Sequence, residues 1–374
     1  MKIAFIISGL GVGGAEAQIL ALAREFIARG HCVTIISMTG RCAHVLPELM
    51  GLQLIELRES KSIFGLLSIA VKVARALREG AFDIVHTHMF HANIIARLIR
   101  PWIRCAVLVS TAHSNVEGGH FRTLMYRYTD RFADFTTNVS ASAVQRYVHI
   151  GAAPASKIGV VYNGVDIEKF SPDMGVRERL RAELGFSSRE FVVLTVGRLV
   201  PAKNYPLLIK AFAAFHAAIP NARLVIVGDG PLVSAVRELI SASGLSDVTK
   251  LLGRRNDVRE VMNIADLFVL ASKWEGFGLV VAEAMATQSP VVATSAGGLP
   301  EVVGDAGTVV PSGDVQALTF AMKSIARMTP EMRLRLGRAA RHRIESQFSL
   351  SAIAETWLRL YDELLLKRVK MHLS

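Results

Sequence analysis

Short apolar runs alternate with longer amphipathic segments along most of this chain, and this alternation constrains the fold more than any other feature. The runs at residues 2–8, 33–38 and 84–88 are typical of buried strands, and amphipathic segments of helical period follow the first and third. Strands that alternate with helices form parallel sheets covered by helices on both faces. The sequence therefore predicts an α/β protein with doubly wound sheets.

The alternating pattern runs twice. A chain of 374 residues is too long for one ordinary core and fits two domains, which commonly have about 100–200 residues each. We expect a first domain at residues 1–168 and a second at 190–350, with the polar segment 169–190 between them. We expect a last helix at 351–374 to cross back to the first domain.

Composition excludes some classes of protein. A hydrophobic share of 51% with 20% charged residues excludes a disordered chain. The net charge of +11 would suit nucleic acid, an anionic membrane face or a diphosphate ligand, and charge alone does not choose among them. No run reaches the roughly 18 apolar residues of a transmembrane helix, so we expect any membrane contact to be peripheral. The three cysteines, Cys32, Cys42 and Cys105, are odd in number and lack metal-ligand spacing, so we expect them to be reduced and structural in a cytoplasmic protein.

Residues 275–286 combine a glycine turn, a helix start and two carboxylates. Gly276 and Gly278 fall between a predicted strand and a predicted helix, whose first N–H groups can bind phosphate or sugar hydroxyls. Glu275 lies in the turn and Glu283 in the helix. A carboxylate accepts two hydrogen bonds at once, which suits the vicinal diol of a ribose or of a sugar ring.

Cations and glycines follow other strands of the second domain. Arg198 and Lys203 leave its first strand, where arginine offers a fork to phosphate oxygens and lysine a point charge. Either one alone would be a solvated loop charge, but their shared position favours ligand binding. Gly228, Gly253 and Arg254 follow the next two strands. They can border a nucleotide, although turn formation alone would also explain them.

The first domain begins with the glycine loop Gly9-x-Gly11-x-Gly13-Gly14. Phosphate or substrate binding and a plain strand-to-helix turn explain this loop equally well.

Histidines gather near the strand ends of the first domain, namely His86, His88, His91 and His113. Zinc is disfavoured, because these histidines belong to different strands and no carboxylate or cysteine lies at ligand spacing. We expect His113 instead to orient a hydroxyl or a backbone carbonyl near a reacting centre.

Together these motifs resemble the retaining glycosyltransferases of family 4, and the resemblance covers nearly the whole chain. It rests on Gly13-Gly14-Ala15-Glu16, residues 83–88, residues 163–166, Gly197-Arg198 with Lys203, residues 228–231, residues 275–283 and residues 297–301. The two glutamates that flank a Gly-Phe-Gly turn are the most specific of these. The resemblance implies the GT-B architecture, in which two Rossmann-like domains face each other across a cleft.

The resemblance also implies a role for each motif. Arg198 and Lys203 would hold the donor diphosphate, and Glu283 would bind the ribose hydroxyls. Glu275 and the backbone of the turn would contact the donor sugar, with His113 near the sugar and the acceptor. The implied catalytic residues are His113, Glu275, Arg198 and Lys203; the implied donor-binding residues are Gly13, Gly14, Arg198, Lys203, Gly228, Gly253, Arg254, Phe277, Gly278, Leu279 and Glu283. Ala17 stands where relatives often carry arginine, which puts a charged acceptor contact there in doubt.

The implied chemistry needs no metal and no cofactor. Negative charge develops on the leaving diphosphate while the sugar becomes oxocarbenium-like, and fixed cations stabilise that charge. The chain has no Asp-x-Asp sequence, the motif with which enzymes of the other main transferase fold hold a metal. Retention by front-face attack is favoured over a covalent intermediate, because no carboxylate is clearly a nucleophile.

An apolar stripe in the first domain bears on the acceptor. It consists of Phe121, Leu124, Met125, Tyr128 and Phe132, interleaved with Arg122, Arg127 and Arg131. Such a stripe more commonly packs on a sheet, but with the basic tail at 364–370 it favours peripheral attachment to an anionic inner leaflet. The acceptor would then be a saccharide or a lipid-linked saccharide of cell-surface biosynthesis, and the donor a UDP-sugar.

Other functions are also compatible with these motifs. A GT-B epimerase acting on UDP-N-acetylglucosamine would share the fold and the donor, and a non-catalytic nucleotide-sugar-binding subunit would share the site. A nucleic-acid binder is the weakest alternative, because the charges follow no aromatic stacking platform or recognition helix.

Overall fold

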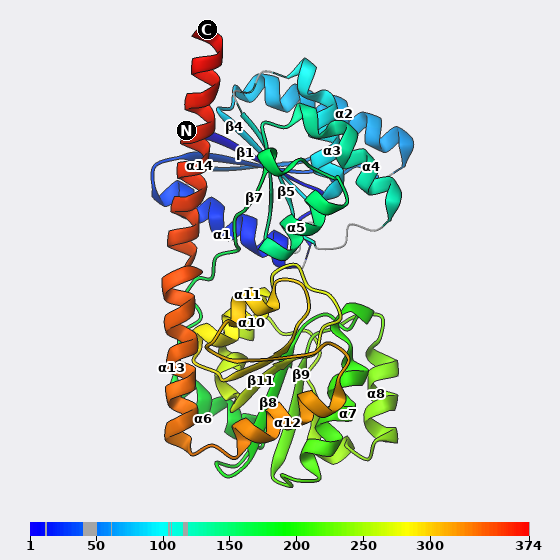
Figure 1. Ribbon diagram of the computed structural model, residues 1–374, viewed down its shortest axis with the longest axis vertical. Coiled ribbons are helices and arrows are strands. Elements are labelled where there is room, and N and C mark those ends of the chain that lie inside the picture. The colour runs from blue at the N-terminus through cyan, green and yellow to red at the C-terminus, as the bar shows by residue number, and fades with distance from the viewer. Residues whose placement is uncertain are drawn as a thin grey trace. The chain divides into compact units, whose positions relative to one another are not determined.

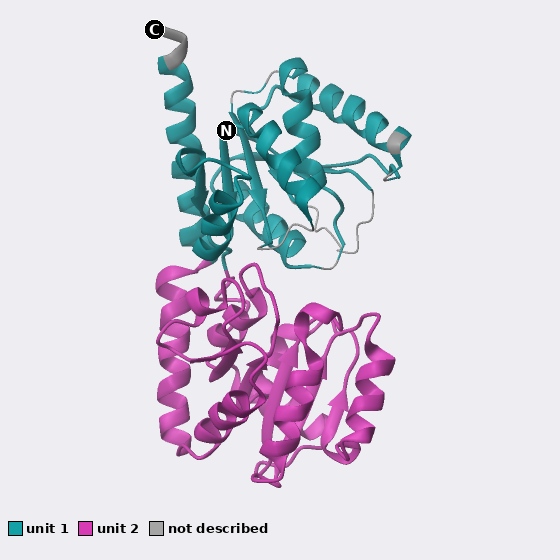
Figure 2. Cartoon of the chain, turned by 45° about the vertical axis from the view of Figure 1, so that its right-hand side comes forward, with its two compact units in different colours: residues 1–164, 350–374 teal, residues 165–349 magenta. Residues whose placement is uncertain are grey.

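The computed structural model describes residues 1–11, 13–39, 51–60, 62–103, 105, 107–114 and 119–373. Figure 2 shows its two compact units. Unit 1 comprises Met1–Gly164 with Leu350–Ser374, and unit 2 comprises Val165–Ser349. Cys42 lies outside the described residues. Among those described, no helix is long and apolar enough to cross a membrane.

Unit 1 is built on a seven-stranded sheet in the order β3-β2-β1-β4-β5-β6-β7, and every adjacent pair is parallel. Its strands are β1 Lys2–Ile7, β2 Cys32–Ser37, β3 Leu52–Glu56, β4 Ile84–His88, β5 Val107–Ala112, β6 Phe135–Asn138 and β7 Ile158–Val160. Its helices are α1 Gly14–Ala28, α2 Ile63–Gly80, α3 Phe90–Ile99, α4 His120–Thr129, α5 Ala141–His149 and α14 Leu350–Leu373, with short 3-10 turns η1 Arg100–Trp102, η2 Asp130–Phe132 and η3 Ala155–Lys157.

Helices cover both faces of this sheet (Figure 1). Alternate strand residues such as Phe5 pack against α1 and α14, whose Trp357 and Tyr361 are fully buried. The other residues, such as Val85, pack against α2 and α3. The last helix of the chain is therefore a structural part of unit 1, because its aromatic side chains complete one of the core layers.

Unit 2 has a six-stranded parallel sheet in the order β10-β9-β8-β11-β12-β13. Its strands are β8 Phe191–Val196, β9 Ala222–Val227, β10 Thr249–Leu251, β11 Leu267–Leu270, β12 Val291–Thr294 and β13 Thr308–Val310. Its helices are α6 Met174–Glu183, α7 Tyr205–His216, α8 Val233–Ala242, α9 Val258–Val261, α10 Leu279–Ala286, α11 Leu299–Val303, α12 Val315–Ala326 and α13 Pro330–Gln347, with 3-10 turns η4 Pro201–Lys203, η5 Ser246–Val248 and η6 Met262–Ile264. The two parallel sheets confirm the predicted fold class.

The segment 169–190, which we expected to lie between the domains, belongs to unit 2. It contains α6, whose N-terminus is capped by the side chain of Asp173. Arg177 and Arg181 of this helix form ion pairs of 2.6 and 3.0 Å with Asp266 at the start of β11. These ion pairs attach α6 to the sheet, so the polarity of the segment reflects an anchored helix rather than a linker.

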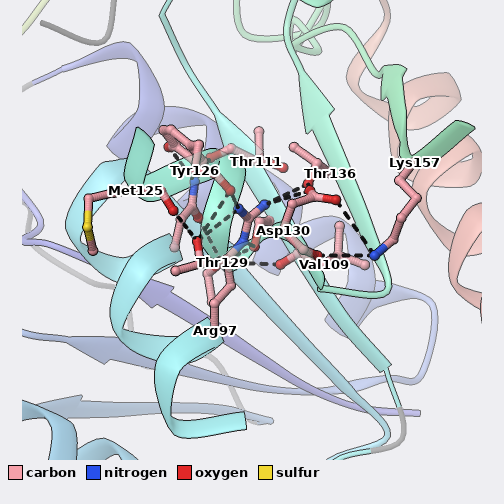
Figure 3. Close-up of polar contacts among 12 residues, drawn as sticks. Arg97, Val109, Thr111, Met125, Tyr126, Thr129, Asp130, Thr136 and Lys157 are labelled. Atoms are coloured by element: carbon pink, nitrogen blue, oxygen red, sulfur yellow. Dashed lines mark hydrogen bonds and ion pairs between the residues drawn. The ribbon is translucent and has the colours of Figure 1, made fainter. Parts of the chain in front are cut away.

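A buried arginine ties several elements of unit 1 together (Figure 3). Arg97 of α3 is fully buried, and its guanidinium donates to Ser110 of β5 and Thr136 of β6 at 3.1 and 2.6 Å. Asp130 in η2 lies 3.7 Å from the guanidinium and also 3.7 Å from the ammonium of Lys157. A buried charge is tolerated only when it is paired and hydrogen-bonded, and this network meets that requirement.

Candidate functional site

Three loops of unit 2 form a hydrogen-bonded frame at the carboxyl ends of β8, β9 and β10. The amide of Leu199 donates to the carbonyl of Asp229 at 2.9 Å, and the amide of Gly228 donates to the carbonyl of Gly253 at 2.8 Å. Gly228 has φ 142°, and a Cβ atom there would collide with the carbonyl oxygen of Gly197. Glycine is therefore required for the close approach of these loops, which place Arg198, Arg254, Gly228 and Gly253 at one edge of the sheet.

Two charged residues on neighbouring loops of unit 2 form an ion pair. The ammonium of Lys203, in η4, lies 2.7 Å from Oε2 of Glu275, and both side chains are largely buried. Ser272 donates to the same carboxylate oxygen at 3.1 Å. The amide of Lys273 also donates to the carbonyl of Ala202 at 2.7 Å, which joins the two loops through their backbones. The predicted cation and the predicted carboxylate are thus neighbours in the fold, and the carboxylate is held by two partners.

Arg198 differs from Lys203 in its surroundings. Its side chain is exposed, and among the described residues it makes no hydrogen bond and no ion pair. Because the ammonium of Lys203 is ion-paired with Glu275, the exposed guanidinium of Arg198 supplies an unpaired positive charge on the same loop. Arginine binds phosphate oxygens through a planar fork of N–H groups, so this position suits an anionic ligand.

The glycine turn before α10 depends on two independent contacts. Gly278 has φ 93°, and a Cβ atom there would collide with the side chain of Leu299 in α11. The ring of Phe277 is buried and lies 5.6 Å from the ring of Phe348. The Phe277 side chain therefore anchors the turn, and α10 begins at Leu279 without a side-chain cap. The first N–H groups of a helix lack partners within the helix, so this end can donate to a ligand.

Glu283 lies in the second turn of α10 and is half-buried. Its carboxyl group has no hydrogen bond and no ion pair among the described residues. Burial raises the pKa of Glu283 to about 8, and the charge of Lys169 opposes this shift only in part. A half-buried carboxylate that receives no hydrogen bond from any described residue is partly desolvated, and the two hydroxyls of a diol would supply donors.

In unit 1, the glycine loop and His113 follow β1 and β5 respectively. Gly13 is the N-cap of α1, and a Cβ atom there would collide with the carboxylate of Glu16, while Gly14 is exposed. His113 is half-buried, and its Nε2 lies 3.0 Å from Nδ1 of His88. Burial lowers the pKa of His113 to about 4, so its imidazole is neutral near pH 7.

The histidines of β4 lie inside the unit. His86 is hydrogen-bonded on both nitrogens, to Tyr361 of α14 and to Thr111 of β5, each at 2.6 Å. Among the described residues, no group of three histidine, cysteine or carboxylate side chains could hold a metal ion.

A cavity of about 650 Å³ opens beside the glycine loop of unit 1. Its lining residues follow β1, β2, β3 and β4 or lie at the start of α1, and they are Ser8, Gly9, Gly11, Glu16, Thr39, Arg58, Glu59, Ser60 and Met89. Sequence reasoning missed Arg58, Glu59 and Thr39, which belong to no recognisable motif. Their only signal is that they follow β2 and β3, where loops of a parallel sheet bind ligands.

Each unit matches a glycosyltransferase family model over most of its length. Residues 12–169 match the family model described as Glycosyltransferase Family 4, and residues 176–343 match the model described as Glycosyl transferases group 1.

Several proteins of known activity are similar in sequence. The N-acetyl-alpha-D-glucosaminyl L-malate synthase of Bacillus anthracis is 28% identical over 96% of this chain and 95% of that protein. A GDP-mannose-dependent phosphatidylinositol monomannoside mannosyltransferase of Mycolicibacterium smegmatis is 33% identical over 74% of this chain and 75% of its own length. An Escherichia coli galactosyltransferase, which uses UDP-Gal and alpha-D-GlcNAc-diphosphoundecaprenol, is 31% identical over 61% of this chain and 62% of its own.

Solved structures share the fold over the whole chain. The Anabaena protein HepE, solved in complex with UDP, is 25% identical with a TM-score of 0.82 over 97% of this chain and all of that one. A sucrose-phosphate synthase of Thermosynechococcus elongatus is 22% identical with a TM-score of 0.86, over 98% of this chain and all of that one.

Proposed function

The chain belongs to the family 4 glycosyltransferases of GT-B fold, and from this premise we propose that it is a retaining enzyme that moves a hexosyl or N-acetylhexosaminyl group from a UDP-sugar to a saccharide or lipid-linked saccharide. One observation carries the proposal. Lys203, Glu275 and the unpaired Arg198 lie on loops at the carboxyl ends of neighbouring strands of unit 2, with α10 beginning beside them.

The charges at this edge fit the departure of a diphosphate. When the anomeric bond breaks, negative charge grows on the leaving phosphate oxygens, and Arg198 and Lys203 are already in place to stabilise it. A leaving diphosphate that is stabilised by cations needs no proton from a general acid. We therefore assign the reaction to these fixed cations, with front-face attack by the acceptor hydroxyl, whose proton passes to the departing phosphate oxygen, and with no requirement for a metal.

The donor nucleotide is assigned from Glu283 and from the relatives. Glu283 lacks donors of its own, and the 2′- and 3′-hydroxyls of a ribose would supply two. The similar Anabaena protein has been solved with UDP, and the similar Escherichia coli enzyme uses UDP-Gal. Glu275, held by Lys203 and Ser272, would then meet the donor sugar together with the backbone of residues 277–279.

We assign the reaction to an acceptor that is held at the membrane surface. Two similar enzymes act on lipid-linked acceptors, as their names state. In unit 1, Phe121 and Tyr128 of α4 are 71% and 68% exposed, and the exposed Arg127 and Arg131 lie one and three residues from Tyr128 in the sequence. Met125 instead packs against the core, so the predicted stripe divides between packing and exposure. We propose that the exposed part rests on the anionic inner face of the cell membrane, where cell-surface polysaccharides or glycolipids are assembled.

A donor screen tests this function. Purified protein would be incubated with a panel of sugar nucleotides, with and without lipid-linked acceptors, and the products analysed by mass spectrometry. We expect acceptor-dependent release of UDP. Acceptor-independent formation of an isomeric sugar nucleotide would instead identify an epimerase. A chain that binds UDP but turns over no donor would be a binding subunit.

A further inference from the structure

His88 ends β4 in a fully buried position beside His113. Its Nδ1 lies 3.0 Å from Nε2 of His113, and the two ring centroids are 5.3 Å apart. The other nitrogen of His88, Nε2, is also buried but has no hydrogen-bond partner among the described residues. Among the described residues, the one hydrogen-bond partner of the His88 side chain is therefore the histidine that we place near the reacting sugar.

In the part of the chain that the structure describes, the neighbours of His88 offer no second hydrogen-bond partner. The ring of His86 lies 4.0 Å from it and the ring of Phe5 5.3 Å from it, measured between centroids. Both nitrogens of His86 are already engaged, by Tyr361 and by Thr111. His88 is thus enclosed by aromatic rings that are themselves held in place.

Counting the donor and acceptor nitrogens of the two imidazoles shows which arrangements of the proton between them are possible. Burial lowers the pKa of His88 well below its ordinary value and that of His113 to about 4, so both rings are neutral near pH 7. A neutral imidazole has one N–H donor and one acceptor nitrogen. Two arrangements therefore satisfy the bond between them, and they differ in which ring donates.

Only one arrangement avoids an orphaned donor. If His113 donated from Nε2, the proton of His88 would sit on its buried Nε2, where no described residue offers an acceptor. If His88 donates from Nδ1, only a lone pair is left buried on its Nε2. Buried N–H groups without a partner are rarer in proteins than buried acceptors without one, so the second arrangement is favoured.

We propose that His88 is a positioning residue that donates its Nδ1–H to Nε2 of His113 and so fixes the proton of His113 on Nδ1. Nδ1 of His113 has no hydrogen-bond partner among the described residues, and the ring is half-buried. His113 therefore presents an N–H donor to an oxygen of the sugar or the acceptor. It does not serve as a general base, because its Nε2 lone pair is already occupied by His88.

This inference rests on the proposed function, because it places His113 at the bound sugar, but its first test needs no substrate. The protein would be labelled with ¹⁵N-histidine, and the His113 signals identified by their loss in His113→Gln. Long-range ¹H–¹⁵N correlations then show which nitrogen carries the proton. We expect a protonated Nδ1 and a hydrogen-bonded, unprotonated Nε2. A proton on Nε2 of His113 would overturn the assignment.

Two substitutions of matched size test the role of His88. Asparagine places an amide N–H near the former Nδ1, whereas leucine removes the donor. In His88→Leu we expect the His113 Nε2 signal to shift and kcat to fall roughly tenfold or more, with UDP affinity unchanged. His88→Asn should restore the wild-type tautomer and most of the turnover.

Tyr361→Phe provides the control, because it removes a hydrogen bond from the neighbouring His86 and leaves His88 intact. It should not change the His113 signals. Unchanged His113 signals in folded His88→Leu would overturn the role of His88, as would equal turnover in the leucine and asparagine variants. Wild-type protein with the expected tautomer but no transferase activity would count against the proposed function instead.

Discussion

The ammonium of Lys203 lies 2.7 Å from the carboxylate of Glu275, so the cation that we assign to the donor diphosphate is already paired in this structure. Lys203→Ala should weaken UDP binding about ten- to a hundredfold, the loss of a charge-assisted hydrogen bond worth about 1.5–3 kcal/mol. Glu275→Gln should leave UDP affinity unchanged or increase it, because a competing negative charge is removed, while turnover falls. Titration calorimetry with UDP measures the affinity of both variants, and a transferase assay measures the turnover of Glu275→Gln. Equal UDP affinity in wild type and Lys203→Ala would refute the diphosphate assignment.

UDP binding should release protons, and the affinity for UDP should increase as the pH rises. The pKa of Glu283 is raised to about 8 by burial, so its carboxyl group is mostly protonated at pH 7. Ribose hydroxyls donate to the ionised form and must therefore displace that proton. UDP affinity should rise between pH 6 and pH 8 and level off above pH 8, and binding heats should depend on the ionisation enthalpy of the buffer. Glu283→Gln should abolish both effects, and a pH-independent affinity in the wild type would contradict the ribose assignment.

Gly278 should be among the least replaceable residues of unit 2. Alanine at this position should lower the free energy of unfolding by about 1–2 kcal/mol through the left-handed backbone and by a further amount of about 1–3 kcal/mol through crowding against Leu299. Gly244 has a φ of 67° with open space around it, so Gly244→Ala should cost only the backbone term. Urea unfolding of the two variants isolates the contact with Leu299. If both lose the same stability, the contact contributes nothing.

Arg97→Ala should be strongly destabilising, by about 3–5 kcal/mol, because Asp130 would remain buried without its guanidinium partner. Adding Asp130→Ala should recover part of the loss, and a double-mutant cycle measures the coupling. Arg75→Ala serves as the control, because its ion pair with Glu79 is exposed to solvent and should contribute little to stability. Additive effects of Arg97→Ala and Asp130→Ala would show that the network of Figure 3 is not coupled.

Membrane binding should depend on Phe121 and Tyr128. Sedimentation with phosphatidylglycerol vesicles should show binding that weakens in high salt and falls roughly tenfold or more in Phe121→Ala, because a buried phenylalanine is worth about 1.5–3 kcal/mol. Phe320 of unit 2 is equally exposed, at 72%, so Phe320→Ala is a matched control. Similar losses in both variants would mean that α4 is not the membrane contact.

Much of the fold follows from local sequence. Buried strands such as β8 are apolar at all but one position, and the start of α10 follows a glycine turn, so local sequence patterns place both elements. The helix α6 was missed because only Leu180 and the ion-paired Arg181 are buried on it, which leaves a mostly polar sequence. Its Asp173 cap was a usable signal. The three-residue strand β7 is too short to show a pattern.

Some features of the candidate site could also be predicted from local sequence, and others could not. Each of the loops that carry Arg198, Lys203 and Glu275 follows a recognisable strand, so their meeting at one sheet edge could be expected. The hydrogen bond between His88 and His113 could not be expected, because it joins the end of β4 to the loop after β5 and depends on the rotamers of both rings. The unpartnered state of Glu283 is equally invisible in sequence, since it arises from what surrounds α10 in space.

The path of the chain has a consequence for its synthesis. Unit 2 is one uninterrupted segment whose ends meet, since the amide of Val165 donates to the carbonyl of Phe348 at 2.8 Å. Unit 1 needs Trp357 and Tyr361 from α14 to complete its core. Domains generally fold as units during synthesis, usually from the N-terminus onward. Here the ribosome must finish the inserted unit 2 and release the last helix before the unit that was started first can close its core.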